Sequence, residues 1–421
     1  MSFVVRCSVD TRPVSAPGLE TCRRPFGRGH LTLGFEPGSC QVSASAAGLS
    51  CRETVGRNAS PGDSEDLARI EVRGSAELVL WTGLTTARGF YFHVGPDGGF
   101  TCASDAALLR ALGVGLEPDL GVLPEYFVYR CVMPPKTLFR GVFELFQATL
   151  TVRASATGFE IGKPVLQPPV PESNGPLEAG EATDACLEEL RGALEHVPDD
   201  PERLCLLLSG GIDSSTLFRL CQDRFGVQQS YSTGYPFERE SDNREKRYAE
   251  TAAAALGASH TYWSGDVATF LAAVIRTTAA AGEPIHHHQS AMIWGLVGQV
   301  PAQRDVVVMG SAAATVFGSS GQLLVHQLGN HPAVRAVAAT PLRSAVIKAS
   351  ARLGRGRRFA RALRLSGTLD LPLEDPRHGI WTMHAYGSRD WIRAHFEAPE
   401  SAWFENRRAR LAGHEQRSLS E

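Results

Sequence analysis

The sequence lacks the features that mark membrane, nucleic-acid-binding or disulfide-rich proteins. Its apolar runs, such as residues 204–208, are far shorter than the roughly 20 residues that span a bilayer. Its first residues, MSFVVRCSVD, contain neither a basic leader nor a sustained apolar region, so they do not resemble a secretory signal and predict a cytoplasmic location. Lys and Arg number 42 against 45 Asp and Glu, so the overall charge favours neither a nucleic acid nor a membrane as a partner. The nine cysteines are scattered and include no CxxC pair, which predicts buried free thiols and argues against a disulfide framework or a zinc ribbon.

The composition is that of an ordinary globular protein, and the chain is long enough for more than one domain. Its 421 residues exceed the size at which one hydrophobic core usually keeps growing. The segment 163–178, KPVLQPPVPESNGPLE, carries five prolines, which restrict the backbone and remove hydrogen-bond donors. We therefore predict a linker at residues 166–178 between a domain of residues 1–165 and a domain of residues 179–421.

The two predicted domains differ in their apolar patterns. Upstream of the linker, short alternating segments between glycine-containing turns predict a sheet-rich domain with one helix at 104–112. Downstream, continuous apolar runs alternate with helical stretches, which is typical of a doubly wound parallel sheet. The predicted strands are 204–208, 228–233, 259–263 and 305–309, and the predicted helices are 214–224, 244–256, 267–280 and 290–299.

From about residue 319 the chain is predicted to be helical and rich in arginine. Residues 343–364 interleave seven arginines and one lysine with Ala, Val, Ile and Leu. This pattern fits a solvated helix face beside a core-facing stripe, and it also fits a surface that receives an acidic partner segment.

The segment 204–215, LCLLLSGGIDSS, carries the clearest chemical signal. A buried strand leads into Ser209, Gly210 and Gly211, and a helix is predicted to begin near Asp213. Paired glycines allow backbone N–H groups to surround a phosphate or pyrophosphate at a helix N-terminus. Hydroxyl groups would come from Ser209, Ser214 and Ser215, and Asp213 would bind Mg²⁺ held by the phosphates. The alternative is that these polar residues only cap the helix.

The string SGGIDSS lacks the GK[ST] of a Walker loop and resembles the PP-loop of the ATP pyrophosphatases. It is most similar to the asparagine synthetase class, which includes β-lactam synthetases and lasso peptide cyclases. Residues 240–260, ESDNREKRYAETAAAALGASH, resemble a further segment of that class, which makes Glu245 and His260 candidate catalytic residues. Residues 101–112 and 134–145 resemble the later half of its glutaminase-like domain.

The resemblance implies an α/β protein with an N-terminal glutaminase-like (Ntn-type) sandwich and a C-terminal PP-loop domain. It also implies that ATP and Mg²⁺ are used to activate a carboxylate as an acyl-adenylate, which an amine then attacks. Ser232 and Gly234, at the end of the second parallel strand, would face adenine. We expect a small-molecule or peptide carboxylate as substrate, in a biosynthesis of the natural-product or antibiotic type.

Three departures from the family pattern qualify this expectation. Ser2 and Phe3 stand where a glutaminase needs a terminal cysteine, so we expect a degenerate glutaminase-like domain and no use of glutamine. Ala314 aligns with an aspartate of the family's metal site. The only lysine after position 315 is Lys348, so residues 319–421 look truncated relative to the family. The alternative function is therefore a catalytically reduced nucleotide-binding or scaffolding subunit that needs a partner chain.

Two further expectations concern a loop and the assembly. The segment 283–288, EPIHHH, is predicted to be a polar loop beside the substrate pocket, because three adjacent histidines cannot all face one metal from a regular element. We also expect a homodimer, or a partner chain that completes the synthetase site, because apolar side chains concentrate near the C-terminus. They are Ile380, Trp381, Trp391, Ile392, Phe396, Trp403 and Phe404.

Overall fold

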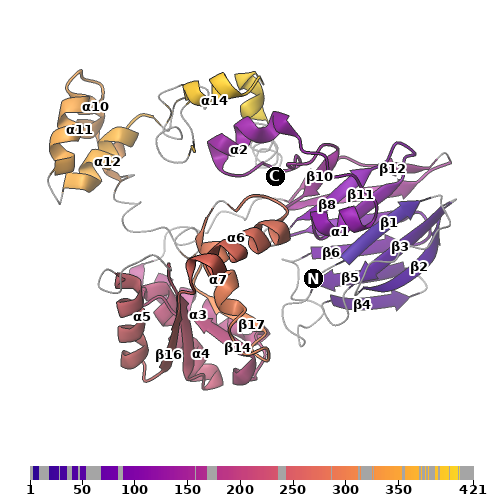
Figure 1. The fold of residues 1–421 in the computed structure, drawn as a ribbon, viewed down its shortest axis with the longest axis horizontal. Helices are drawn as coiled ribbons and strands as arrows, with labels where there is room; N and C mark the ends of the chain where they lie inside the picture. Colours follow the sequence, from indigo (N-terminus) through magenta and orange to yellow (C-terminus); the bar gives the residue numbers. More distant parts are fainter. Residues whose placement is uncertain are drawn as a thin grey trace. The chain divides into compact units, whose positions relative to one another are not determined.

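The computed structural model divides the chain into two compact units (Figure 1). One unit comprises Met1–Asp119 and Pro134–Met309, and the other comprises Leu120–Met133 and Gly310–Arg408. The residues that the structure describes are 3–8, 19–27, 29–35, 40–45, 48–53, 68–83, 89–156, 158–167, 178–235, 243–285, 287–311, 313, 325, 327–352, 356–368, 371, 375, 378, 385–386, 389–397, 399–405 and 407.

The N-terminal part of the first unit contains two antiparallel sheets. One has the strand order β10-β8-β9-β1-β3-β2, built from β1 (Phe3–Ser8), β2 (Glu20–Phe26), β3 (Gly29–Phe35), β8 (Phe90–Val94), β9 (Phe100–Ala103) and β10 (Val142–Leu145). The other has the order β12-β11-β7-β6-β5-β4, with β13 paired to β11. Its strands are β4 (Cys40–Ser45), β5 (Gly48–Glu53), β6 (Ala68–Arg73), β7 (Glu77–Thr82), β11 (Ala148–Ala154), β12 (Phe159–Ile161) and β13 (Val165–Leu166).

Alternate side chains of both sheets form one shared core. Val5 and Cys7 of β1 are buried together with Ile70 of β6 and Leu78 and Leu80 of β7. This period of two is what a half-buried strand requires, so the predicted sheet-rich domain is confirmed. The short helix α1 (Ala106–Ala111) lies inside the predicted 104–112. A relation of this sandwich to glutaminase domains stays a prediction.

The second part of the first unit is a four-stranded parallel sheet with the order β16-β15-β14-β17. Its strands are β14 (Leu204–Leu207), β15 (Gln229–Thr233), β16 (Ser259–Trp263) and β17 (Val306–Met309), each within one residue of its predicted bounds. The helices are α3 (Ala179–Ala193), α4 (Ile212–Phe225), α5 (Arg244–Ala255), α6 (Val267–Ala281) and α7 (Gln289–Val297). The sequence predicted the last four and missed α3.

The central strand β14 is covered on both faces. Leu204 and Leu206 pack with Phe218 of α4, whereas Cys205 packs with Leu296 of α7. A strand buried on both sides explains the unbroken apolar run in the sequence. The chain moves outward from β14 to β15 and β16 and then returns to β17 on the other side of β14. This reversal creates a topological switch point at the carboxyl ends of β14 and β17, where such sheets bind ligands.

The second unit is helical in its described residues. It contains η1 (Leu120–Val122), α2 (Leu123–Tyr129), α10 (Pro332–Ala338), α11 (Arg343–Arg352), α12 (Arg357–Leu365), α14 (Arg389–His395) and η6 (Glu400–Trp403). The predicted helical, arginine-rich region is therefore confirmed where the structure describes it.

Several of the apolar residues near the C-terminus are buried, although Trp391 is 40% exposed. Ile392, Trp403 and Phe404 are buried in one cluster with Val128 of α2. The expectation of an exposed apolar surface is wrong for Ile392, Trp403 and Phe404, because a helix from early in the sequence packs against them. Ile380 and Trp381 lie outside the described residues. The buried side chains no longer argue for an oligomer, and the expected oligomer stays a prediction.

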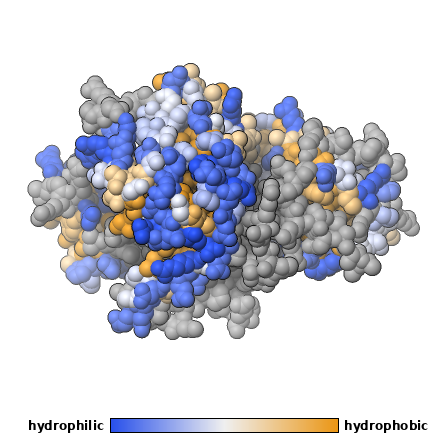
Figure 2. Space-filling model, turned by 90° about the horizontal axis from the view of Figure 1, so that it is seen from below, coloured by the Kyte–Doolittle hydropathy of each residue, from blue (hydrophilic) through white to orange (hydrophobic). Residues whose placement is uncertain are grey.

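The visible face in Figure 2 is mainly hydrophilic at its centre, with small apolar patches between the polar side chains. Among the described residues, no helix combines the length and apolar character needed to cross a bilayer.

Candidate nucleotide site at the PP-loop

The loop Ser209–Gly211 joins β14 to α4 and lies against the backbone of α5. Gly210 has φ of +77°, a conformation that favours glycine. A Cβ atom at this position would overlap the carbonyl group of Tyr248 and would lie 2.8 Å from the backbone nitrogen of Ala249. Glycine is therefore required both by the backbone angle and by the close approach of α5.

Two serines hold the loop in its shape. The buried Ser214 hydroxyl donates to the Gly211 carbonyl at 3.2 Å and accepts from the Ser209 N–H at 3.2 Å. The Ser209 Oγ lies 3.0 Å from the Ser214 Oγ and accepts from the Gly211 N–H at 3.3 Å. Ser214 thus braces the loop from inside, while Ser209 is exposed beside it. Phosphate contacts by Ser209, Ser214 and the partly buried Ser215 stay predictions.

The N-terminus of α4 has no side-chain cap. Its N-cap residue is Gly211, and no side chain among the described residues accepts a hydrogen bond from the first turn. The alternative that polar residues of the motif cap this helix is therefore wrong. The first helical hydrogen bond runs from the Ser215 N–H to the Gly211 carbonyl at 3.0 Å. The preceding helical N–H groups have no acceptor within the helix, which makes this end suitable for an anion.

Asp213 supplies a carboxylate at the same helix end. Its side chain is exposed, and it makes no ion pair or side-chain hydrogen bond with the described part of the chain. Mg²⁺ commonly uses one or two protein carboxylates together with substrate phosphates and water, so a single aspartate fits a metal that arrives with ATP. The described residues contain no cluster of three acidic, His or Cys side chains that could hold a metal without phosphates.

The carboxyl end of β15 contributes a second part of the site. The buried Gly234 donates its N–H to the Trp263 carbonyl at 3.2 Å, and a Cβ at Gly234 would overlap the Tyr262 hydroxyl. Next to it, the Thr233 Oγ1 is buried and has no hydrogen-bond partner among the described residues. The predicted role of Ser232 and Gly234 toward adenine stays a prediction.

Asn243, which sequence reasoning missed, connects these two parts. It is buried at the N-cap of α5, where its Oδ1 accepts from the Lys246 N–H at 2.9 Å and its Nδ2 donates to the Tyr262 hydroxyl oxygen. The Lys246 ammonium lies 5.1 Å from the centroid of the Tyr262 ring. Helix α5 is thus fixed at one point to Tyr262 of β16, whose hydroxyl lies beside Gly234, and it touches Gly210 at another. An asparagine just before a helical stretch is a capping signal that could have identified this residue.

The two catalytic candidates lie in different surroundings. Glu245 is exposed in the first turn of α5. His260 lies near the amino end of β16, opposite Ser230 in the ladder, with Nδ1 2.9 Å from the Ser230 Oγ and Nε2 2.8 Å from the Ser232 Oγ. Because the Ser230 hydroxyl also donates to the Ser259 carbonyl at 3.1 Å, it accepts from the His260 Nδ1–H. Both ring nitrogens therefore bind serines of the one neighbouring strand β15, and partial burial lowers the His260 pKa. This geometry favours a structural role, and catalysis by either residue stays a prediction.

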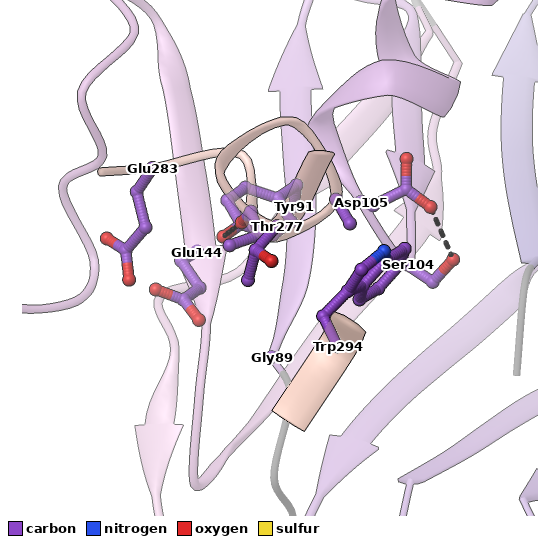
Figure 3. A pocket seen from close by; sticks show the side chains of 10 residues that line it. Gly89, Tyr91, Ser104, Asp105, Glu144, Thr277, Glu283 and Trp294 are labelled. Atoms are coloured by element: carbon purple, nitrogen blue, oxygen red, sulfur yellow. Dashed lines mark hydrogen bonds between the residues drawn. The ribbon is translucent and has the colours of Figure 1, made fainter. Parts of the chain in front are cut away.

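The predicted polar loop lies near the end of β15. The ring of His288 is 4.9 Å from the ring of Tyr235, which directly follows Gly234, and 4.9 Å from the ring of His287. Glu283 instead lines a pocket of about 260 Å³ with Tyr91, Asp105 and other residues that do not belong to the PP-loop. Figure 3 shows Glu283 and Glu144 on one side of this pocket and Asp105 and Trp294 on the other. Burial raises the pKa of Glu283.

Comparison with known proteins identifies the family. Residues 186–408 match the family model described as asparagine synthase. The chain belongs to the asparagine synthase family. The match contains the PP-loop and supports an ATP-dependent, ligase-type enzyme. No curated protein matches the chain. The departure at Ala314 falls within this match but lies outside the described residues.

Proposed function

We propose that the protein is an ATP-dependent synthetase that forms an amide bond through an acyl-adenylate and releases AMP and pyrophosphate. The observation that carries this proposal is the PP-loop, in which a braced Ser-Gly-Gly turn leads into an uncapped helix at the switch point of a parallel sheet. An uncapped helix end with an adjacent carboxylate suits the pyrophosphate part of Mg·ATP.

The loop residues would act on the pyrophosphate group. Backbone N–H groups at the start of α4 would bind its oxygens, and the exposed Ser209 hydroxyl would donate to it. Asp213 would hold Mg²⁺, and the bound ion would neutralise part of the negative charge of the phosphates. The end of β15, with Ser232 and Gly234, would bind the nucleoside.

The reaction has two balanced steps. In the first, a carboxylate oxygen of the substrate attacks the α-phosphorus of ATP, and the bond to the β-phosphate oxygen breaks to release pyrophosphate. In the second, an amine nitrogen attacks the acyl carbon, the bond to AMP breaks, and the nitrogen loses one proton. The protein's contribution to the first step is positioning and charge stabilisation of the leaving pyrophosphate.

The amine comes from a source other than glutamine in this proposal. Cys7 is fully buried in the sandwich core, and burial raises the pKa of its thiol, so this cysteine is a core residue and not an exposed nucleophile. A second candidate function is a nucleotide-binding subunit that depends on a partner. The alanine at position 314, where the family pattern has an aspartate, favours it.

The decisive experiment has two readouts. The first is the rise in melting temperature caused by MgCl₂ with sodium pyrophosphate or ATP. Asp213→Asn should remove most of this shift, whereas the matched change Asp223→Asn, on an exposed residue of the same helix, should preserve it. Equal shifts in the wild type and Asp213→Asn would refute the assignment of the loop.

The second readout is exchange of labelled pyrophosphate into ATP in the presence of a panel of amino acids and peptides as carboxylate donors. Exchange that depends on one of these carboxylates supports the synthetase. Pyrophosphate binding with no exchange across the panel favours the second candidate.

A further inference from the structure

The two turns of the candidate nucleotide site extend beyond the point at which their strands are hydrogen-bonded. Residues 209–211 follow β14, and residues 232–234 end β15. The last backbone hydrogen bond between these two segments runs from the Leu208 N–H to the Tyr231 carbonyl at 2.8 Å. Beyond it, residues 209–211 and 232–234 share no hydrogen bond in the described part of the chain. The strand ladder therefore does not fix the distance between the two turns by itself.

Helix α5 reaches both turns. In its second turn, the Tyr248 carbonyl occupies the space that a Cβ at Gly210 would need. At its N-terminus, the buried Asn243 donates from Nδ2 to the Tyr262 hydroxyl oxygen, and a Cβ at Gly234 would overlap that same hydroxyl group. The Tyr262 hydroxyl thus lies between the cap of α5 and the end of β15, and α5 connects this point to the PP-loop.

The two ends of α5 are held in different ways. Near its C-terminal end, Ala253 is buried in the cluster around β14, and the Leu256 carbonyl accepts from the Gln222 Nε2 of α4 at 3.0 Å. The N-terminal end lies at the carboxyl ends of the strands and is held through the hydrogen bond of Asn243 to Tyr262. Loss of this bond would release the first turns of α5 and leave the apolar packing of its last turn in place.

We propose that the Asn243–Tyr262 hydrogen bond sets the distance between the pyrophosphate loop and the nucleoside turn. This inference rests on the proposed function, in which residues 209–211 bind pyrophosphate and residues 232–234 bind the nucleoside. Both side chains are positioning residues, because they act through α5 and β15 without contacting the ligand. ATP spans both turns and binds well only when their spacing is correct, whereas pyrophosphate or AMP needs one turn alone.

Three ligands distinguish this role from a general loss of structure. They are ATP and pyrophosphate, each with MgCl₂, and AMP, with each Kd measured by isothermal titration calorimetry. Tyr262→Phe removes the bond, and so does Asn243→Ser, because a serine caps α5 through the Lys246 N–H but is too short to reach Tyr262. Loss of one hydrogen bond should raise the Kd for ATP by about three- to tenfold. Because Ser214 braces the loop from within, the Kd values for pyrophosphate and AMP should change by less than about twofold.

The double variant tests whether the two residues act through each other. Asn243→Ser/Tyr262→Phe should raise the Kd for ATP no more than either single change, because each single change already removes the whole bond. Tyr91→Phe is the matched control. It removes a hydroxyl that donates instead to the Ala281 carbonyl at 3.4 Å, and it should preserve the affinity for all three ligands.

The outcomes separate this inference from the function on which it rests. A wild type that binds none of the three ligands refutes the proposed function and the inference with it. A wild type that binds ATP, with variants that bind ATP equally well, refutes the inference alone.

Two further results would also overturn the inference. One is an equal loss of affinity for ATP and for pyrophosphate or AMP, which would show that the residues act on one turn or on the fold. The other is a loss in the double variant equal to the product of the two single losses. Circular dichroism checks that each variant is folded, and Tyr262→Phe, which removes one oxygen atom, decides the result if Asn243→Ser unfolds.

Discussion

Replacement of Gly210 by alanine tests the contact on which the PP-loop depends. The added Cβ meets two obstacles, because the residue has φ of +77° and because the carbonyl group of Tyr248 occupies the space that the methyl group needs. A left-handed conformation costs a non-glycine residue about 1–2 kcal/mol. Forcing a methyl group into a packed site costs about 1–3 kcal/mol more. We therefore expect Gly210→Ala to lower the free energy of unfolding by about 2–5 kcal/mol.

Gly226, at the other end of α4, provides the matched control. Its φ of +69° is similar, but a Cβ there would have no atom within 4 Å. Gly226→Ala should therefore lower the free energy of unfolding by only about 1–2 kcal/mol, the cost of the backbone angle alone. The difference between the two variants isolates the contact with α5.

Urea denaturation followed by circular dichroism measures both changes in the free energy of unfolding. The shift in melting temperature caused by Mg²⁺ with pyrophosphate measures ligand binding at the loop. Gly210→Ala should reduce the rise in melting temperature that Mg²⁺ and pyrophosphate cause, because the loop must move away from α5. Gly226→Ala should preserve it. Equal destabilisation by the two changes, together with unaltered pyrophosphate binding, would show that the loop does not depend on α5.

Three further predictions follow from burial and protonation. Because burial lowers the pKa of His260, the imidazole binds a proton more readily in the unfolded chain than in the folded one, so this group reduces stability as the pH falls below about 6.5. His260→Gln should therefore lose less stability than the wild type between pH 7.5 and 5.5 in urea titrations. Trp403→Ala should cost about 3–5 kcal/mol in the same assay, because the side chain is 1% exposed, whereas Trp391→Ala, at 40% exposure, should cost less. Native protein should release no glutamate from glutamine, and Cys7 should resist alkylation until the protein is unfolded; rapid native labelling of Cys7 would contradict its place in the core.

The sequence by itself was sufficient for the elements whose signals are local. Strand β14 is a short apolar run bounded by turns, and its bounds were predicted to within one residue because a strand buried on both faces needs unbroken apolar character. The bounds of β15, β16 and β17 were predicted equally closely, although β15 and β16 are more polar. The PP-loop was found for a similar reason, since its glycines, serines and aspartate are contiguous. The family match over residues 186–408 confirms the resemblance that this motif carried.

Only the tertiary structure decided what depends on residues far apart in the chain. Val128 packs with Ile392, Trp403 and Phe404, and nothing in the local pattern of either segment indicates the other, so these three residues were wrongly expected to be exposed. The contact of Gly210 with α5 likewise depends on how two helices pack on one sheet. Periodicity shows that a side chain will be buried, but the partner that buries it is set by chain topology and by packing between distant segments.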